Sequence, residues 1–496
     1  AFNLENFQQK LFQLTSHRKF LVAYSGGLDS HVLLYSLMQL RKKIPAIYLR
    51  AVHVHHGLSA NADHWAAHCE KICSDWQIDF ILRRVQIKKN SSCSIEALAR
   101  EMRYQTITDV LEKNEVLLTA HNQNDQAETI LLQLIRGAGP RGLAAMPEKK
   151  LFGSEKETEL IRPLLSFSRK NLQDFAEKEK LNWIEDESNQ LIHFDRNYLR
   201  QEILPSLEKR WSGVIKNLSR SAEHSAESFH LLDETADQDL QTIEHQKNVL
   251  AIFDLLKLSS VRQKNVLRRW LHLAGAPMLE TLQLEHVRKD LLYSKEDAQP
   301  KIKWQHFILR RYQHQLFLEK EKNKNLKQDF KKNSLTWDLK WEDLTSNLIL
   351  PNDVGKLSVE KIYPLQMKLN DTTQKDSSSV SKQGDEKKTD CRDKSRLVRS
   401  NKTTNTQAEI LSLIKLKNKK ITVRFRQGGE WMHPLHRSKG TTLKHLFQEW
   451  QIPPWKRNSI PLIFCDDQLI AVVGFDIEKK FAAKEDEEGV RIRIKN

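Results

Sequence analysis

Short β-rich runs alternate with segments of helical periodicity throughout the first 137 residues of the chain. The predicted strands are 19–25, 45–57, 79–87 and 115–122. The predicted helices are 30–43, 62–76, 94–114 and 125–137. Alternation at this spacing favours a mostly parallel, doubly wound α/β sheet with helices on both faces. Because ligands of such sheets bind beyond the carboxyl ends of the strands, a functional site is expected there.

The remainder of the chain changes character twice. Residues 216–325 show a helical pattern with one late strand, which predicts a small, mainly helical domain after the α/β domain at 1–215. Residues 326–496 mix strand-like runs with a helical segment, "TTLKHLFQEW", and predict a mixed α+β domain. Within it, residues 370–407 have almost no large apolar side chains. They cannot bury enough surface to offset their ordering entropy, so this insertion is predicted to be mobile.

Composition narrows the partners and the compartment. Lys and Arg number 80 against 64 Asp and Glu, and the net charge of +16 favours a polyanionic partner, with a merely basic surface as the simpler alternative. The five cysteines are odd in number and include no C-x-x-C pair, so neither a disulfide framework nor a zinc ribbon is indicated. We therefore expect a reducing, cytoplasmic location. No apolar run approaches the ~20 residues of a membrane span.

The stretch "FLVAYSGGLDSHVLLYSL" places a glycine pair between a predicted strand and a predicted helix. A Gly-Gly turn lets backbone N–H groups point inward, and the helix start behind it adds unpaired donors, which together favour phosphate binding. The hydroxyls of Ser25 and Ser30 are further donors. Asp29 would repel phosphates unless a Mg²⁺ ion lies between them, so it is a candidate metal ligand. The alternative is an ordinary turn in which Asp29 caps the helix.

Polar residues also cluster at two other strand ends. "VHVHHGL" places three histidines, of which His55 is a candidate nucleotide contact and the others are expected to be packed. "TAHNQNDQAET" brings His121, Asp125 and Glu128 to another strand end. A single histidine is usually structural, whereas polar clusters at several neighbouring strand ends indicate a site. For Glu128 the rival interpretation is a first-turn acid stabilised by the helix dipole.

At this point the sequence resembles a known family. "SGGLDS" is similar to the pyrophosphate loop of the N-type ATP pyrophosphatases (the PP-loop superfamily). The motifs "SGGLDS", "HVHHGL", "EALAREMRY", "HNQNDQAET", "RGAGPRGLAAM", "IRPLL", "WIEDESN" and "FDRNYLRQEILP" occur in the order found in the bacterial tRNA(Ile)-lysidine synthetase family. "RFRQGGEWMHP" and "LKHLFQEWQIPPWKRNSIPLIF" resemble the C-terminal domain of its long form. Two departures stand out: Asn124 replaces a usual acid, and Leu191-Ile192 replace further acids.

The resemblance implies a reaction and its participants. The family joins lysine to C2 of the wobble cytidine of a minor isoleucine tRNA with a CAU anticodon, through an adenylated tRNA, and releases AMP and pyrophosphate. The expected cofactors are ATP and Mg²⁺, and the expected partners are tRNA and L-lysine, with no membrane. A homodimer is one option for the assembly. The middle domain and the tail segments "RFRQ", "HRSKGTTLK" and "PPWKR" are candidates for reading the acceptor side of the tRNA, whereas Trp450 and Trp455 are expected in the core.

These considerations assign roles to individual residues. The predicted nucleotide-binding residues are Ser25, Gly26, Gly27, Leu28, Asp29, Ser30, His55 and His121. The predicted catalytic residues are Asp29, Asp125 and Arg196, with Asp29 also the metal ligand. The resemblance assigns Asp125 and Glu128 to lysine recognition. The predicted contacts with tRNA or phosphate are Arg100, Arg103, Arg200, Arg424, Arg426, Lys439 and Lys444.

Two rival functions are kept. A tRNA thiolase of the same superfamily would need reactive or cluster-binding cysteines, and the chain lacks a C-x-x-C pair. A non-catalytic RNA-binding protein would explain the basic charge but not the polar clusters at the strand ends. Release of AMP that depends on lysine and tRNA distinguishes a ligase from both.

Overall fold

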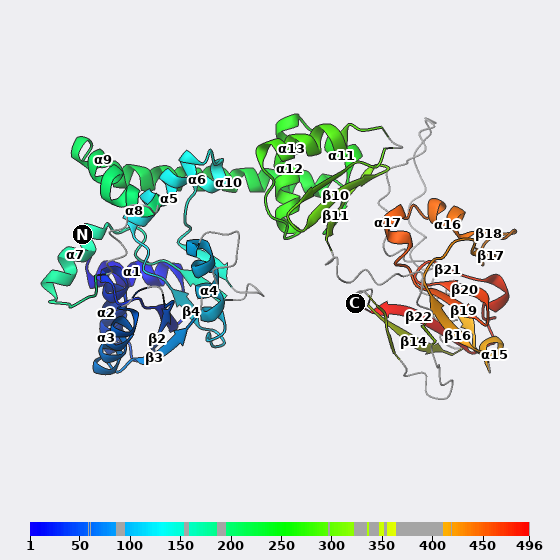
Figure 1. The fold of residues 1–496 in the computed structure, drawn as a ribbon, viewed down its shortest axis with the longest axis horizontal. Helices are drawn as coiled ribbons and strands as arrows, with labels where there is room; N and C mark the ends of the chain where they lie inside the picture. The colour runs from blue at the N-terminus through cyan, green and yellow to red at the C-terminus, as the bar shows by residue number, and fades with distance from the viewer. Residues whose placement is uncertain are drawn as a thin grey trace, which may run out of the picture. The chain divides into compact units, whose positions relative to one another are not determined.

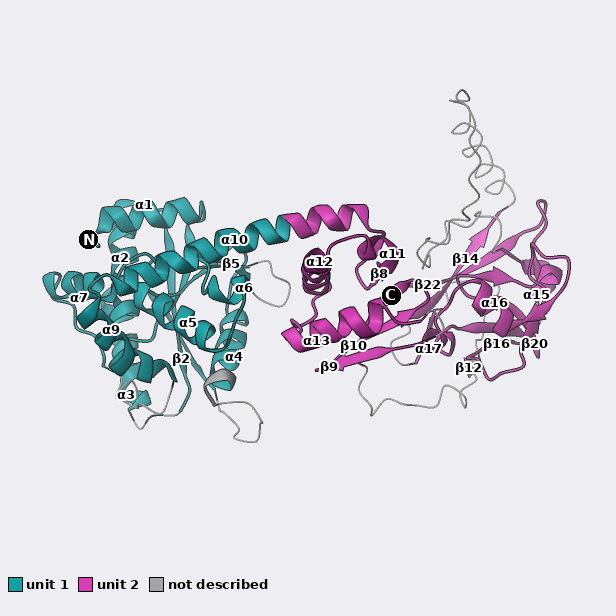
Figure 2. Cartoon of the chain, turned by 90° about the horizontal axis from the view of Figure 1, so that it is seen from above, with its two compact units in different colours: residues 1–234 teal, residues 235–496 magenta. Residues whose placement is uncertain are grey.

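The computed structural model (Figure 1) describes residues 1–57, 59, 61–85, 95–152, 158–185, 195–295, 298–321, 335–336, 347–351, 355–363, 410–417 and 419–495, with the backbone alone for 95–97, 152 and 335–336. They form two compact units, Ala1–Glu234 and Thr235–Asn496 (Figure 2), and each is described by itself. The insertion at 370–407, predicted to be mobile, lies outside the described residues. The domain boundaries predicted near 215 and 325 stay predictions.

Unit 1 is built around a six-stranded sheet in the order β3-β2-β1-β4-β6-β5. Its strands are β1 (Lys19–Ala23), β2 (Tyr48–His55), β3 (Asp79–Arg84), β4 (Val116–Leu118), β5 (Lys149–Phe152) and β6 (Thr158–Ile161). All neighbouring pairs are parallel except β5 and β6, which are antiparallel. The mostly parallel sheet predicted from the sequence is confirmed, and the antiparallel edge pair was not foreseen.

The strand order reverses direction at β1. From β1 the sheet grows through β2 to β3 on one side and through β4 to β6 on the other. In register, Val22 of β1 pairs with Leu118 of β4, so the carboxyl ends of these two strands lie side by side. Chains that leave neighbouring strands in opposite directions open a crevice between them, and this is where α/β sheets bind their ligands.

Helices cover both faces of the sheet. The helical segments of unit 1 are α1 (Leu4–Leu14), α2 (Leu28–Lys43), α3 (Ala62–Asp75), α4 (Ile95–Thr108), α5 (Gln123–Ile135), α6 (Pro140–Leu143), α7 (Arg169–Lys178), α8 (Asp195–Tyr198), the π-helix η2 (Leu199–Ile203), α9 (Leu204–Arg210) and α10 (Val214–Thr242), which continues into unit 2. Side chains alternate along a strand, so Phe20 faces the core under α1, α2, α3 and α7, while Leu21 packs with Ile107 of α4 on the other face.

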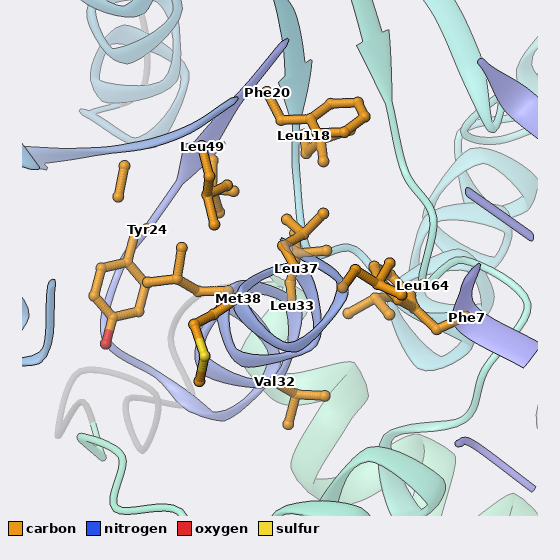
Figure 3. Close-up of a cluster of buried hydrophobic side chains, with 14 of the residues drawn as sticks. Phe7, Phe20, Tyr24, Val32, Leu33, Leu37, Met38, Leu49, Leu118 and Leu164 are labelled. Atoms are coloured by element: carbon orange, nitrogen blue, oxygen red, sulfur yellow. The ribbon is translucent and has the colours of Figure 1, made fainter. Parts of the chain in front are cut away.

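The larger core fixes the start of α2. Leu33 and Leu37 of α2 lie among buried side chains of three strands, including Phe20, Leu49 and Leu118 (Figure 3). All five side chains are almost fully buried. Because α2 is held against the sheet along its length, the turn that precedes it is held in place as well.

The first half of unit 2 combines helices with a five-stranded antiparallel sheet in the order β7-β8-β11-β10-β9. Its elements are β7 (His245–Gln246), β8 (Val249–Ala251), α11 (Ile252–Leu256), α12 (Ser260–Leu273), α13 (Thr281–His286), the π-helix η3 (Val287–Leu292), β9 (Lys301–Trp304), β10 (Phe307–Tyr312) and β11 (Gln315–Lys320). The helical pattern predicted here agrees with α12, α13 and η3, whereas the short α11 was not foreseen. The prediction of one late strand was incomplete, because most of these strands are too short to show a period.

The rest of unit 2 is mainly β-structure. One sheet has the order β12-β16-β19-β20-β21, a second β13-β14-β22-β15, and β17 pairs with β18. The elements are β12 (Leu335–Thr336), β13 (Leu348–Ile349), β14 (Lys356–Ile362), β15 (Leu411–Ser412), α15 (Leu413–Leu416), β16 (Ile421–Arg424), β17 (Trp431–Met432), β18 (Thr441–Thr442), α16 (Leu443–Glu449), α17 (Pro454–Arg457), β19 (Leu462–Cys465), β20 (Gln468–Val472), β21 (Asp476–Ile477), the 3₁₀ turn η5 (Lys479–Phe481) and β22 (Gly489–Lys495). This agrees with the predicted α+β character.

A membrane-spanning helix is not found in the part of the chain that the structure describes, where every helix is too short or too polar.

Candidate active site

The loop between β1 and α2 is closed by its own serines. Ser25 N donates to Ser30 Oγ at 3.2 Å, the two hydroxyl oxygens lie 3.0 Å apart, and Ser30 Oγ donates to Gly27 O at 3.0 Å. Gly27 caps α2 without a side-chain hydrogen bond, so no side-chain cap claims the first-turn amides. Leu28, predicted to bind nucleotide, is buried in the larger core of unit 1. A helix start of this kind, with its positive dipole end exposed, favours an anion.

Gly26 is required by both its conformation and its surroundings. Its φ of +85° lies in the region that side-chain-bearing residues rarely adopt. A Cβ atom there would lie 2.9 Å from Cys69 Sγ and 2.9 Å from Ile184 Cδ1. Ile184 N also donates to Gly26 O at 2.9 Å, so the segment after α7 holds the loop from the other side. The loop is therefore wedged between α3 and this segment.

Asp29 is the buried acid of the loop, and its surroundings disfavour its charged form. Its Oδ1 is buried and has no hydrogen-bond partner among the described residues. Burial, and next the negative charge of Asp125, raise the pKa of Asp29 to about 6, against the opposing effects of Arg169, Arg200 and a hydrogen bond from Asn122. Two carboxylates that repel each other beside an unpartnered oxygen favour a cation.

The end of β4 supplies the second acid of this site. Asn122 caps α5: its Oδ1 accepts from Asn124 N at 2.9 Å and Asp125 N at 3.1 Å, while Asp125 Oδ2 accepts from Asn122 N at 2.9 Å. This capping box holds the Asp125 carboxylate at the mouth of the helix. Asn124, which replaces the usual acid of the family, accepts from Arg169 N at 3.0 Å and so joins α5 to α7.

Arg200 joins the two acids of α5. Its Nε and Nη2 donate to the two carboxylate oxygens of Glu128 at 2.7 and 3.0 Å, and Nη2 lies 3.3 Å from Asp125 Oδ1. Glu128 is fully buried, which raises its pKa, and Arg200 opposes that shift. Arg200 was predicted to contact phosphate or tRNA, yet here its guanidinium is engaged by the acids. It stands on the π-helix η2, an irregularity often found at functional sites.

His121 and Arg196 adjoin the same group of charges. His121 Nδ1 lies 3.0 Å from Thr119 Oγ1. Burial lowers the pKa of His121 to about 4; Asp125 counters this effect, whereas Arg162, Arg100 and Arg196 add to it. Arg196 also influences Glu128. The structure thus brings the predicted residues Asp29, His121, Asp125, Glu128, Arg196 and Arg200 together at the crevice between β1 and β4.

The three histidines at the carboxyl end of β2 have separate partners. His53 Nδ1 lies 3.0 Å from Tyr24 O in the core, and His55 Nε2 lies 3.4 Å from both Asp63 Oδ1 and Arg84 Nη1. His56 Nε2 accepts from Arg103 Nε at 3.1 Å. Burial lowers the pKa of His56 to about 4, so it accepts as the neutral ring. His55, the predicted nucleotide contact, is therefore held toward β3.

Of the predicted basic contacts, Arg100 lies over the ring of Tyr104, 5.3 Å from its centroid. The predicted basic contacts of unit 2 differ in whether an acid of the protein already lies near them. Arg424 pairs with Asp467 at 2.8 Å, and Arg426 lies 4.0 Å from Glu430. Lys439 and Lys444 are exposed, and among the described residues no carboxylate pairs with either.

Three site residues were missed from the sequence. Asn122 and Arg169 influence Asp29, and Arg162 influences His121. The spacing of Asn122 and Asp125 is a capping-box signal that would have found the first. Arg162 occurs in the motif "IRPLL" but is buried in the fold, and Arg169 enters the site from the start of α7, which nothing local in the sequence indicates.

Comparison with known proteins gives three matching family models. Residues 3–207 match the PP-loop domain, residues 250–317 the TilS substrate binding domain, and residues 421–494 the TilS substrate C-terminal domain. The chain is 40% identical over 494 residues to a tRNA(Ile)-lysidine synthase of Coxiella burnetii, which covers 100% of this chain and 97% of the relative. It is 38% identical over 467 residues to that of Serratia proteamaculans, covering 94% and 93%.

Proposed function

The chain belongs to the tRNA(Ile)-lysidine synthase family, and from this premise we propose that it joins lysine to C2 of the wobble cytidine in an isoleucine tRNA with a CAU anticodon. ATP supplies the driving force and is cleaved to AMP and pyrophosphate. The observation that carries the proposal is the convergence of Asp29, Asp125, Glu128 and Arg200 beside the Ser25–Ser30 loop. That arrangement provides an anion-binding turn and an acidic pocket within one crevice.

The first step activates the cytosine. The C2 carbonyl oxygen attacks the α-phosphorus of ATP, the bond to the β-phosphate oxygen breaks, and pyrophosphate leaves. The amides and hydroxyls of Ser25, Gly26, Gly27 and Ser30 would bind the departing diphosphate. His121, which burial keeps neutral, is available as a hydrogen-bonding group toward the nucleotide. Arg196 influences Glu128 but forms no ion pair among the described residues, and it would contact the negatively charged adenylate.

The second step forms the carbon–nitrogen bond. The ε-ammonium of free lysine first gives a proton to an acid of the pocket. The resulting ε-amine attacks C2, and the bond from C2 to the oxygen carrying AMP breaks. Asp125 would receive the lysine ammonium, because one of its oxygens is only loosely held by Arg200 at 3.3 Å. Glu128 is fully engaged by Arg200 and would set the charge of the pocket. Arg200 therefore belongs to the lysine side of the site in this proposal.

Mg²⁺ fits the residues at the loop. Asp29 Oδ1 lacks a donor, Asp125 is its electrostatic neighbour, and among the described residues no group of three or more Asp, Glu, His or Cys side chains forms a metal cage. Mg²⁺ is usually held by one or two carboxylates together with water and substrate phosphates. Asp29, with Asp125, would hold the ion, which when bound would neutralise the charge on the phosphates.

The test is incorporation of labelled lysine into tRNA. Protein incubated with total tRNA, ATP and labelled lysine should label one minor isoleucine tRNA, with one AMP released per lysine bound. Asp29→Asn should abolish labelling, since the amide is nearly isosteric but carries no charge. Asp79→Asn is the matched control: this exposed acid starts β3, at the opposite ends of the strands, and should retain full activity.

Three results would count against the proposal: labelling by Asp29→Asn, labelling of many tRNAs, or AMP release that needs no lysine. RNA binding with no AMP release would favour a non-catalytic binding protein. A thiolase is disfavoured on the described cysteines near the loop, because burial raises the pKa of Cys69 and Cys73 to about 12 and leaves them poor nucleophiles. A cytoplasmic location and a homodimer also stay proposals, the latter testable by light scattering.

A further inference from the structure

Trp431 is a large aromatic side chain at the surface of unit 2. It lies on β17, which pairs with β18 in a short two-stranded ribbon (Figure 1), and 55% of the residue is exposed. Its neighbour Met432 points the other way and is fully buried. A single exposed apolar side chain is common in proteins, so the exposure of Trp431 matters only together with the way its ring is held.

The Trp431 ring is held by the backbone of Gly440. A Cβ atom on Gly440 would lie 1.9 Å from Trp431 Cζ2 and 2.3 Å from Cη2, so the six-membered ring rests where a side chain would be. The backbone of Trp431 also pairs with that of Thr442 on the neighbouring strand, which fixes the position of the residue within the ribbon. The ring is thus ordered before any ligand arrives, and a ligand need not bear the entropy of ordering it.

Positive charges flank this ring. Lys439 directly precedes Gly440, and Lys444 follows the ribbon in the first turn of α16. Both are exposed, and within the described part of the chain neither forms an ion pair. A fixed aromatic surface bordered by unpaired lysines is the arrangement with which proteins bind single-stranded nucleic acid, the base stacking on the ring and the phosphates meeting the lysines.

We propose that Trp431, Lys439 and Lys444 form a stacking site for an unpaired base at the 3′ end of the tRNA. This inference rests on the proposed function, which makes a tRNA the substrate and assigns its anticodon loop to unit 1. The unpaired bases of a tRNA that its own fold does not engage lie in the anticodon loop and at the 3′ end. Since the proposed function assigns the anticodon loop to unit 1, we assign the site on unit 2 to the 3′ end. The net charge of +16 favours RNA over an apolar protein partner.

The experiment is a binding cycle without ATP. Wild type and Trp431→Ala are titrated with the CAU isoleucine tRNA transcript and with the same transcript lacking its unpaired 3′ nucleotides. Trp431→Ala should bind the full transcript roughly 5- to 100-fold more weakly, the range expected for one stacked base. Truncation should weaken wild type by a similar factor and leave the variant nearly unchanged. Trp431→Phe should restore most of the affinity.

The salt dependence of tRNA affinity should distinguish the stacking role of Trp431 from the phosphate contacts of the two lysines. Loss of Trp431 should lower affinity without changing the slope of log K against log salt, whereas Lys439→Ala or Lys444→Ala should each reduce that slope by about 1. Ile414→Ala, which removes another exposed apolar side chain of unit 2, is the matched control and should bind as wild type does. Circular dichroism and thermal melting of each variant show whether it is folded.

Two results would overturn the inference: unchanged affinity in folded Trp431→Ala, or truncation effects of equal size in wild type and variant. A change in oligomeric state on substitution would indicate a protein-binding surface instead. Lysine incorporation by the wild type is measured separately. Incorporation without coupling between Trp431 and the 3′ end refutes this inference alone, and coupling without incorporation refutes the proposed function alone.

Discussion

Arg200 lies within ion-pair distance of both acids of α5, Asp125 and Glu128. It neutralises Glu128, which has no exposed surface, and it is also within reach of Asp125. A buried ion pair contributes little net stability, but one partner without the other leaves an uncompensated buried charge. The Arg200 guanidinium therefore compensates the buried negative charge of Glu128 in the fold. It also sets the net charge that a lysine ammonium would meet.

Removal of Arg200 should affect stability and activity together. Arg200→Met leaves Glu128 buried without a partner and should lower the free energy of unfolding by about 3–5 kcal/mol. The double variant Arg200→Met, Glu128→Leu removes both charges and should recover most of that loss, yet lysine incorporation should stay absent. Thermal melting and the labelling assay measure the two effects. Recovery of activity in the double variant would show that this pair serves the fold alone.

His31 makes the fold of unit 1 sensitive to acid. It is buried, its Nδ1 lies 2.8 Å from Tyr24 Oη, and burial lowers its pKa from 6.5 to about 4. Because the unfolded chain binds a proton below about pH 6.5 and the folded chain does not, stability is fully present above that pH. It is lost as the pH falls toward 4. At pH 5 the loss due to His31 should be about 2 kcal/mol.

The variant His31→Gln tests whether protonation of His31 lowers the stability of unit 1 in acid. Glutamine can keep a hydrogen bond to Tyr24 but does not titrate, so the variant should lose about 2 kcal/mol less than wild type between pH 7.5 and pH 5. Urea denaturation at the two pH values measures the difference, and the other titrating groups cancel between the proteins. His17→Gln, at an exposed position, is the control and should follow wild type. Equal acid losses in all three proteins would refute the assignment.

Among the structural elements, the turn between β1 and α2 depends most on one residue type. Gly26→Ala would introduce both a left-handed conformation, which costs about 1–2 kcal/mol, and a contact of 2.9 Å with Cys69 and Ile184. We expect a lower melting temperature and at least a tenfold loss of ATP affinity, because the amides of the turn must shift. Equilibrium binding of ATP provides the measurement.

Gly57 offers a matched control for this change. Its φ is +65°, but a Cβ atom there would meet nothing within 4 Å. Gly57→Ala therefore carries the conformational cost without the steric one. If both alanine variants weaken ATP binding equally, strain rather than the wedge of α3 and Ile184 explains the effect.

The sequence was informative where elements are long and periodic. Strands β1 to β4 and helices α2 to α5 were predicted because buried parallel strands and amphipathic helices leave distinct patterns. The carboxyl ends of the predicted strands then indicated Asp29, His121 and Asp125 as site residues. Strands such as β8, with three residues, leave no such pattern, and their pairing is decided by contacts distant in the chain. For the same reason the bidentate contact of Arg200 with Glu128, 72 residues away, was not foreseen.

Within unit 2, the "PPWKR" segment joins the helical half to the β-rich half. Trp455 of α17 packs edge-on against Tyr312 and Phe317, with ring centroids 6.0 and 5.8 Å away. The buried Arg457 donates to Tyr312 Oη at 3.2 Å. Core packing, expected for Trp455, is confirmed. The segment was also a candidate tRNA contact, but Trp455 and Arg457 are turned toward the protein.

Unit 2 should therefore unfold as one cooperative body only while Trp455 is present. Trp455→Ala removes the half-buried ring between the two halves and should cost about 2 kcal/mol, roughly half the value for a fully buried tryptophan. Calorimetry should then resolve an additional, earlier transition. Trp431→Ala is the matched control, since that ring is 55% exposed and lies against Gly440, and its loss should add no separate transition. A single unchanged transition in Trp455→Ala would mean that the two halves are coupled by other contacts.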